Sequence, residues 1–413
     1  MLNWANRFNI FCFLDNQDYS MQHHYHDCLL AAGAVNFTSS SNPADIDAFL
    51  GHHWAFGHLS YALKEVLHQQ PSAKEDKIGF PPFFFFHPAV LCQLQGTRLS
   101  ITAADPAAVY SEIEQTPAPE LQPLQPLTIL PKLDRDAYLE KVAALQQHIR
   151  RGDCYEINFC QEFFAEGAEI DPLTAFQRLT AVSPTPFSAL YKLDSLYLVC
   201  ASPERFLLKR DDQLYSQPMK GTIKRDLQDS GRDRQLKEML YQSAKDRAEN
   251  VMVVDLVRND LSRICTDGSV RVNELYGIYS YPKVHQMIST VSGQLRPGTP
   301  FSEILSATFP MGSMTGAPKH RVMELIEAYE PSARGIFSGS VGYIDPQGNF
   351  DFNVVIRSIM YNASAKYLSY QVGSGITVYS DPVQEWEECL LKGEAIREVL
   401  EGSQPYLQNG ASR

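Results

Sequence analysis

Three stretches of the chain repeat apolar residues at the spacing of an amphipathic helix. The first follows Asp134, whose side chain suits a helix N-cap, and ends near Gly152. Its apolar face comprises Tyr138, Val142, Leu145 and Ile149. The second runs from about 232 to 257, and the third from about 382 to 400. The pattern predicts one helix in each stretch.

Shorter segments rich in β-branched and aromatic residues predict strands between turn signals. These segments are 195–200, 337–344, 353–360 and 368–372. Helices and strands follow one another without regular βαβ alternation, which predicts an α+β fold. A proline-rich stretch at 115–131 cannot form helix or central strand. We interpret it as the connection between an N-terminal region, 1–125, that contributes to the same fold and a main body at 130–403.

Composition narrows the functional classes. The 413 residues are 44% apolar, enough for a substantial core, and the net charge of −12 comes from interspersed acidic and basic residues. No basic stripe for nucleic acid is present. No apolar run approaches the ~20 residues that cross a bilayer, and the first sixteen residues lack a signal-peptide pattern. We therefore expect a cytoplasmic protein without a nucleic-acid or membrane partner.

Two acidic pairs stand out on the predicted helices. Asp246 and Glu249 are three residues apart, and Glu385 and Glu388 repeat that spacing, with Lys392 four residues beyond. Two helices that each offer a carboxylate pair could hold Mg²⁺, which binds protein through one or two carboxylates and keeps several waters. Such pairs are also common on the solvated faces of ordinary helices.

Four other segments could carry chemistry. Lys220 lies between Met219 and a glycine, and a lysine in an apolar pocket can become a nucleophile, although a surface lysine is the commoner case. Glu204 directly follows an apolar strand, where partial burial could make it a general acid. Thr315 precedes a predicted helix start. Gly373 and Gly375 mark a close backbone approach or an anion-binding turn.

Seven segments, in this order, resemble the chorismate-binding enzyme family over about residues 134–400. They are GDCYEIN at 152–158, SPE at 202–204, DRAEN at 246–250, DLVRND at 255–260, the stretch 309–319, RGIFSG at 334–339 and the closing stretch 385–392. The resemblance implies a two-part core of face-packed β-sheets with helices outside.

The family contains anthranilate synthases, isochorismate and salicylate synthases, and aminodeoxychorismate synthases. Lys220 favours the last branch, because anthranilate synthases typically have alanine there. Isochorismate and salicylate synthases have a water-activating lysine at the position matched by Glu156. Anthranilate synthase component I remains the nearest alternative, and an inert chorismate-binding subunit is a third.

The resemblance also implies roles for residues. Lys220 would attack C2 of chorismate while Glu204, as general acid, assists loss of the C4 hydroxyl. Ammonia would then add at C4 to give 4-amino-4-deoxychorismate, the precursor of 4-aminobenzoate and folate. Mg²⁺ on Glu249 and Glu388 would bind the ring carboxylate. Supporting residues would be Asp246 and Glu385 at the metal, Lys392 at the same end, Arg357 at the enolpyruvyl carboxylate, and Thr315, Gly373 and Gly375 along the pocket.

Two positions depart from the family pattern. Gln286 replaces the usual histidine, with His285 beside it, and Phe337 replaces a tyrosine that contacts the enolpyruvyl carboxylate in many members. The chain also lacks a cysteine in a nucleophile-elbow context. Glutamine hydrolysis within the chain is therefore not expected, and a separate glutamine amidotransferase subunit would supply the ammonia.

Overall fold

The computed structural model describes residues 1–19, 23–40, 42–118, 124–281 and 283–402. Its strands form one hydrogen-bonded network that divides in two at the long strand β4 (Phe83–Gln95). One edge of β4 pairs with β2 (Cys28–Thr38). The other edge pairs with β3 (Ala55–Leu59) and then with β5 (Arg98–Thr102). The network therefore continues from β4 into two separate sheets.

The first sheet is antiparallel throughout. Outward from β5, β4 and β2 it comprises β1 (Ile10–Asp15), β8 (Phe187–Leu193), β9 (Leu196–Ser202), β18 (Ser358–Asn362), β19 (Tyr367–Ile376) and β7 (Glu156–Glu166), with β6 (Leu130–Pro131) and β15 (Gly316–Ala317) paired to β7. The N-terminal strand β1 thus lies inside this sheet, between β2 and β8.

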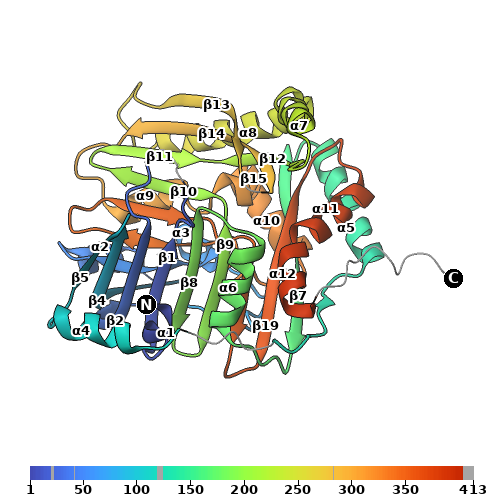
Figure 1. Cartoon of the computed structure of the whole chain (residues 1–413). Helices are drawn as coiled ribbons and strands as arrows, with labels where there is room; N and C mark the ends of the chain where they lie inside the picture. Colours follow the sequence, from blue (N-terminus) through green and yellow to red (C-terminus); the bar gives the residue numbers. More distant parts are fainter. Residues whose placement is uncertain (20–22, 41, 119–123, 282, 403–413) are drawn as a thin grey trace.

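The second sheet is also antiparallel. From β3 it comprises β16 (Ser340–Ile344), β17 (Phe350–Asn353), β10 (Arg205–Arg210), β11 (Gln213–Gln217) and β14 (Val284–Gln294), which also pairs with β12 (Met219–Lys224) and β13 (Arg271–Ser280). In Figure 1 its strands run across the view, whereas those of the first sheet run up and down.

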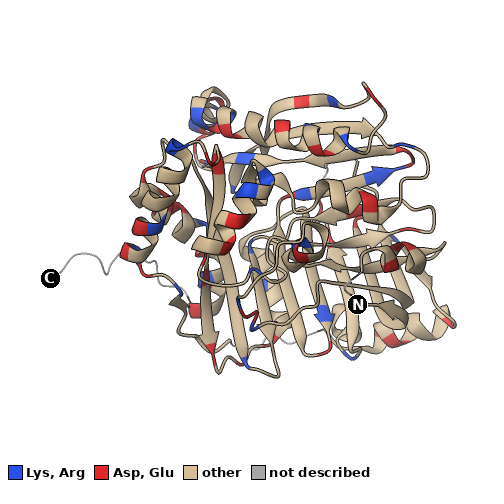
Figure 2. Cartoon of the chain, turned by 180° about the vertical axis from the view of Figure 1, so that it is seen from behind, with Lys and Arg blue, Asp and Glu red and all other residues tan. Residues whose placement is uncertain are grey.

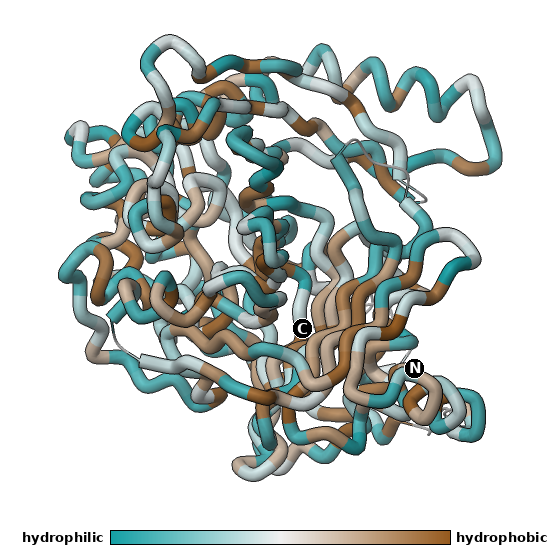
Figure 3. Tube along the Cα trace, turned by 90° about the vertical axis from the view of Figure 1, so that its left-hand side faces the viewer, coloured by the Kyte–Doolittle hydropathy of each residue, from teal (hydrophilic) through white to brown (hydrophobic). Residues whose placement is uncertain are grey.

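Alternation along the strands of the first sheet builds two apolar layers. On β1, Cys12 enters the core between the sheets, where it joins Phe206 and Phe352 of the second sheet. Its neighbours Phe11 and Phe13 point to the other face and pack in a second cluster with helical residues. Side chains two apart lie on one face of a strand, so both faces of this sheet are buried. Figure 3 shows hydrophobic residues concentrated along the inner strands.

The helices lie mainly outside the sheets (Figure 1). The larger ones are α4 (Pro106–Gln115), α5 (Arg135–Arg150), α6 (Pro172–Val182), α7 (Ser230–Gln242), α8 (Ala244–Ser262), α9 (Phe301–Thr308), α10 (Lys319–Tyr329), α11 (Pro382–Lys392) and α12 (Glu394–Glu401). Short helices are α1 (Leu2–Ala5), α2 (Ala44–Leu50), α3 (Lys64–Leu67), η1 (Tyr61–Leu63) and η2 (Gly312–Met314). The predicted α+β class is confirmed.

Individual elements fit the sequence predictions unevenly. Helix α5 begins after Asp134, whose side chain accepts from the Ala137 amide, as predicted. The strand predicted at 195–200 corresponds to β9, which begins one residue later, and the strand predicted at 368–372 lies within β19. Of the predicted connection at 115–131, residues 119–123 lie outside the described residues, as does position 403 at the end of the predicted main body.

Four predicted elements are interrupted. The helix predicted at 232–257 is two helices, because Ser243 adopts an extended conformation (φ −63°, ψ 110°) and its hydroxyl accepts from the Asp246 amide to cap α8. The helix at 382–400 divides at Gly393. The strand at 353–360 breaks where Arg357 takes a left-handed φ of 51°, and that at 337–344 starts only at Ser340.

The surface agrees with the charge pattern. Figure 2 shows acidic and basic residues interspersed over the face opposite to that of Figure 1. Among the described residues, no helix combines the length and the apolar character needed to cross a membrane.

Candidate active site

A partly buried lysine, whose side chain is 13% exposed, and a buried glutamate form the centre of the candidate site. Lys220, on β12, donates to Oε1 of Glu156, at the start of β7, over 2.8 Å. Gly375, on β19, provides the space for this pair. A Cβ atom there would lie 2.4 Å from Oε1 of Glu156 and 3.0 Å from Nζ of Lys220. The close approach of strand and ion pair therefore requires glycine at this position.

The surroundings of Lys220 are acidic. Burial alone would lower the pKa of Lys220, but the carboxylates of Glu156, Glu249 and Glu204 outweigh it and raise that pKa. The sequence left open an apolar pocket that would remove the proton. The structure instead places an ammonium group in an ion pair, so the amine form requires a nearby proton acceptor.

Glu204 lies between β9 and β10 and is only 4% exposed. Burial raises its pKa to about 7, against the opposing influence of a hydrogen bond from Ser313 and the charges of Lys220, Arg357 and Lys392. A carboxyl group with this pKa carries its proton for part of the time at neutral pH. The structure thus places a possible proton donor under the influence of three cations. Lys220 comes from β12, Lys392 from α11 and Arg357 from the segment before β18.

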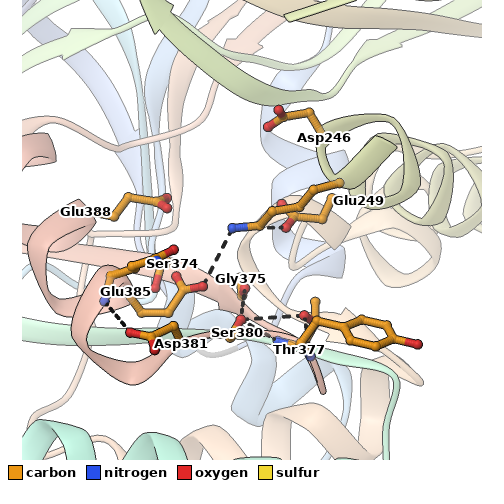
Figure 4. Close-up of polar contacts among 12 residues, drawn as sticks. Asp246, Glu249, Ser374, Gly375, Thr377, Ser380, Asp381, Glu385 and Glu388 are labelled. Atoms are coloured by element: carbon orange, nitrogen blue, oxygen red, sulfur yellow. Dashed lines mark hydrogen bonds and ion pairs between the residues drawn. The ribbon is translucent and has the colours of Figure 1, made fainter. Parts of the chain in front are cut away.

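The two acidic pairs lie on facing helices. Figure 4 shows Asp246 and Glu249 on α8 opposite Glu385 and Glu388 on α11. The Lys245 ammonium lies 3.9 Å from Glu249 and 3.8 Å from Glu385. These carboxylates are therefore not solvated faces of separate surface helices.

Lys392 is a second lysine that contacts these carboxylates. It forms a 2.7 Å ion pair with Glu388 and donates to the Gly373 carbonyl over 2.8 Å. Burial alone would raise the pKa of Glu388, but the charge and hydrogen bond of Lys392, together with the charges of Lys245 and Lys220, outweigh it and lower that pKa. Lys392 thus connects α11 to the strand that carries Gly373 and Gly375.

The donor set fits a hard cation. Oε1 of Glu249 is buried without a hydrogen-bond partner among the described residues, and burial raises the Glu249 pKa to about 7. A bound cation would remove both features. The described residues contain no ready-made group of three or more His, Cys, Asp or Glu side chains for a metal. Mg²⁺ needs fewer protein ligands, because it retains several waters.

Other predicted site residues have structural contacts. The Thr315 hydroxyl donates to the Met311 carbonyl over 3.1 Å. At Gly373, a Cβ atom would lie 2.3 Å from Sγ of Cys160, so glycine is required for strand packing there. Phe337 is 1% exposed and belongs to the core between the sheets. The structure therefore shows packing at Phe337 rather than a polar contact.

Gln286 forms hydrogen bonds with the two residues that follow Lys220. Its amide donates to the Gly221 carbonyl over 2.6 Å and accepts from the Thr222 hydroxyl over 2.7 Å. It fixes the backbone directly after Lys220. His285 points elsewhere, toward Ser280 and Asp233. The departure from histidine therefore leaves a residue that holds β12 in place beside Lys220.

Sequence reasoning missed the contacts of Glu156, Lys245 and Ser313. Glu156 drew attention only as the position of a lysine in related enzymes, and its partner Lys220 is 64 residues away. No spacing rule links positions so distant. Two signals point to the pair in retrospect, a glycine facing it at Gly375 and a second glycine next to Lys220.

The sequence matches a known protein family over most of its length. Residues 12–398 match the family described as chorismate binding enzyme. The anthranilate synthase component I-like protein of Synechocystis sp. is 33% identical over 361 residues, 85% of this chain and 73% of that protein. Aminodeoxychorismate synthase component 1 of Klebsiella aerogenes and of Escherichia coli are each 39% identical over 269 residues, 65% of this chain. The match spans only 59% and 58% of those two proteins.

Solved structures share the fold. Anthranilate synthase component I from Streptococcus pneumoniae superposes with a TM-score of 0.80 at 23% identity, covering 92% of this chain and 95% of that one. The menaquinone-specific isochorismate synthase of Escherichia coli gives a TM-score of 0.75 at 18% identity, over 97% and 91% of the two chains. Since the family match extends over nearly the whole chain, this protein belongs to the chorismate-binding enzyme family.

Proposed function

We propose that the chain is the chorismate-aminating component of an aminodeoxychorismate synthase, which makes 4-amino-4-deoxychorismate for 4-aminobenzoate and folate synthesis. The observation that carries the proposal is a partly buried lysine, Lys220, ion-paired to Glu156, whose charge acts on the buried carboxyl group of Glu204 with its pKa of about 7. These are the nucleophile and the acid that a two-step substitution needs. The names of the relatives that are 39% identical support the same reaction.

In the first step, Lys220 gives a proton to Oε1 of Glu156, 2.8 Å away, and the free amine bonds to C2 of chorismate. The two conjugated ring double bonds each shift by one position, and the C4–O bond breaks. Glu204 donates its proton to the departing hydroxyl, which leaves as water. The adduct nitrogen then carries a positive charge in an acidic environment.

In the second step, ammonia bonds to C4 and the ring double bonds shift back. The C2–N bond breaks, and its electron pair returns to Lys220, which recovers its proton from Glu156. The new C4 substituent is an ammonium group, and solvent reprotonates Glu204. Covalent catalysis thereby divides one difficult substitution into two easier ones.

Binding of the dianionic substrate would use cations at both ends. Arg357 would hold the enolpyruvyl carboxylate through its planar fork. Glu249 and Glu388, with Asp246 and Glu385 nearby, would hold Mg²⁺, which supplies positive charge for the ring carboxylate. Lys392 would assist at that end. Movement of Lys245 away from Glu249 would open the cation position.

We further propose that a separate glutamine amidotransferase supplies the ammonia. The support is chemical, since each of the eight cysteines is buried and none has the sequence context of a nucleophile elbow. Glutamine should support turnover only when the amidotransferase is added. Turnover of glutamine by the purified chain alone would contradict this part of the proposal.

The test is product analysis with purified protein, chorismate, ammonium and Mg²⁺. We expect aminodeoxychorismate by mass spectrometry from the wild type and its loss in Lys220→Ala. Lys224→Ala is the matched control, because Lys224 is an exposed lysine at the end of the same strand. Anthranilate from the wild type would instead favour the activity in the name of the Synechocystis relative.

A further inference from the structure

Among the described residues, only one of the two carboxylate oxygens of Glu156 has a hydrogen-bond partner. Oε1 accepts from Lys220, whereas Oε2 is buried without a hydrogen-bond partner among the described residues. The residue is 2% exposed, so bulk water does not satisfy this oxygen. A buried acceptor without a partner is costly, and in native proteins it commonly marks a ligand or a bound water.

The chemistry of Oε2 limits what can occupy it. An ionised carboxylate only accepts hydrogen bonds, so the occupant must bring N–H or O–H groups. The carboxylates of the substrate are repelled by Glu156. The leaving hydroxyl needs a donor instead, which Glu204 provides. Ammonia has three N–H groups and can bind an acceptor while its lone pair stays free to attack carbon.

We propose that Glu156 binds the incoming ammonia through Oε2 while Oε1 holds Lys220, an inference that rests on the proposed function. The two ring carbons concerned, C2 and C4, are both bonded to C3, just as the two oxygens are both bonded to one carboxyl carbon. One carboxylate can therefore hold the leaving and the attacking nitrogen side by side. Oε2 remains an acceptor whether or not Oε1 carries the Lys220 proton.

Glu156→Gln tests this assignment. The glutamine oxygen can still accept a hydrogen bond from Lys220 but cannot take its proton, so kcat should also fall. The amide nitrogen in place of Oε2 donates and cannot accept a hydrogen bond from ammonia. With the purified chain and ammonium chloride, we expect the KM for ammonium to rise roughly 10- to 100-fold, the effect of losing one charge-assisted hydrogen bond. The KM for chorismate should stay within about twofold of the wild type.

Glu162→Gln is the matched control. Glu162 lies on the same face of β7, is also buried, and accepts from the Tyr367 hydroxyl over 2.9 Å, away from Lys220. Its KM for ammonium should equal that of the wild type. If Glu156→Gln does not fold, Glu156→Ala replaces it, and sodium formate should lower the KM of that variant for ammonium by supplying the missing carboxylate.

The outcomes separate the two proposals. A wild type that makes no aminated product overturns the proposed function and this inference with it. A wild type that aminates chorismate, together with an unchanged ammonium KM in Glu156→Gln, overturns only the inference and leaves a water on Oε2. An equal rise in the KM for chorismate and for ammonium also overturns it, because the effect is then general distortion of the site.

Discussion

Adding one methyl group at Gly375 should disrupt the centre of the site. The Cβ atom of Gly375→Ala would lie 2.4 Å from Oε1 of Glu156, and real Cβ contacts essentially never fall below 3.0 Å. The carboxylate must therefore move by about 0.6 Å, the difference of these distances, or the strands must separate. Nζ of Lys220 would lie 3.0 Å from the same Cβ atom, so the carboxylate has little space to move on that side.

The cost can be bounded from the two opposing effects. Separating a buried ion pair costs about 3–5 kcal/mol. Alanine recovers about 0.5–1 kcal/mol over glycine in a strand, because the unfolded chain loses less entropy. The net destabilisation should be about 2–4 kcal/mol. We also expect kcat to fall at least tenfold, since Lys220, the proposed nucleophile, is displaced.

Denaturant unfolding and steady-state rates measure the two effects. Glu156→Ala provides the control background, because it removes the carboxylate oxygen that the added methyl group would meet. In that background, Gly375→Ala should cost less than about 1 kcal/mol, and the difference between backgrounds is the coupling energy. A single variant with wild-type stability and rate would refute the reasoning, as would an equal cost in both backgrounds.

Two further predictions concern the carboxyl groups. Because burial raises the pKa of Glu204 from 4.5 to about 7, the folded state holds an extra proton between these values, so its contribution to stability is lost as pH rises through that window, by about 3 kcal/mol. Glu204→Gln should remove this part of the pH dependence, measured by denaturant titration from pH 4 to 8, together with most of the activity; an unchanged slope would contradict the burial argument. Glu249→Gln should raise the Mg²⁺ concentration for half-maximal activity at least tenfold, whereas Glu387→Gln, on an exposed position of α11, should leave it unchanged. Equal Mg²⁺ titrations in both variants would remove Glu249 from the proposed metal site.

Periodicity predicted the regular elements and failed where a side chain competed with it. The α5 helix and the strands β9 and β19 follow directly from apolar spacing and an Asp N-cap. The break at Ser243 was not predicted, because serine is tolerated inside a helix and capping depends on its backbone conformation. Arg357 interrupts a strand with a left-handed φ that its residue type does not indicate.

For the site, ordered motifs could name residues but not their contacts. Lys220 and Glu204 were candidates from residue type and resemblance. Their burial, which raises the pKa of Glu204, depends on packing between strands distant in sequence. The contact of Lys245, on α8, with carboxylates of both α8 and α11 could not be predicted either, because it depends on how the two helices face one another. Contacts between residues that are distant in sequence are determined only when the chain is folded.

The position of β1 inside its sheet has a consequence for synthesis. Phe13 lies opposite Leu190, so the first strand cannot complete its pairing until nearly 180 further residues have left the ribosome. β3 waits longer, since its partner β16 begins at Ser340. Loop-closure entropy slows such non-local pairing, and unpaired apolar strands are prone to aggregate. We expect slow folding of the nascent chain, with the early strands protected by chaperones until translation is almost finished.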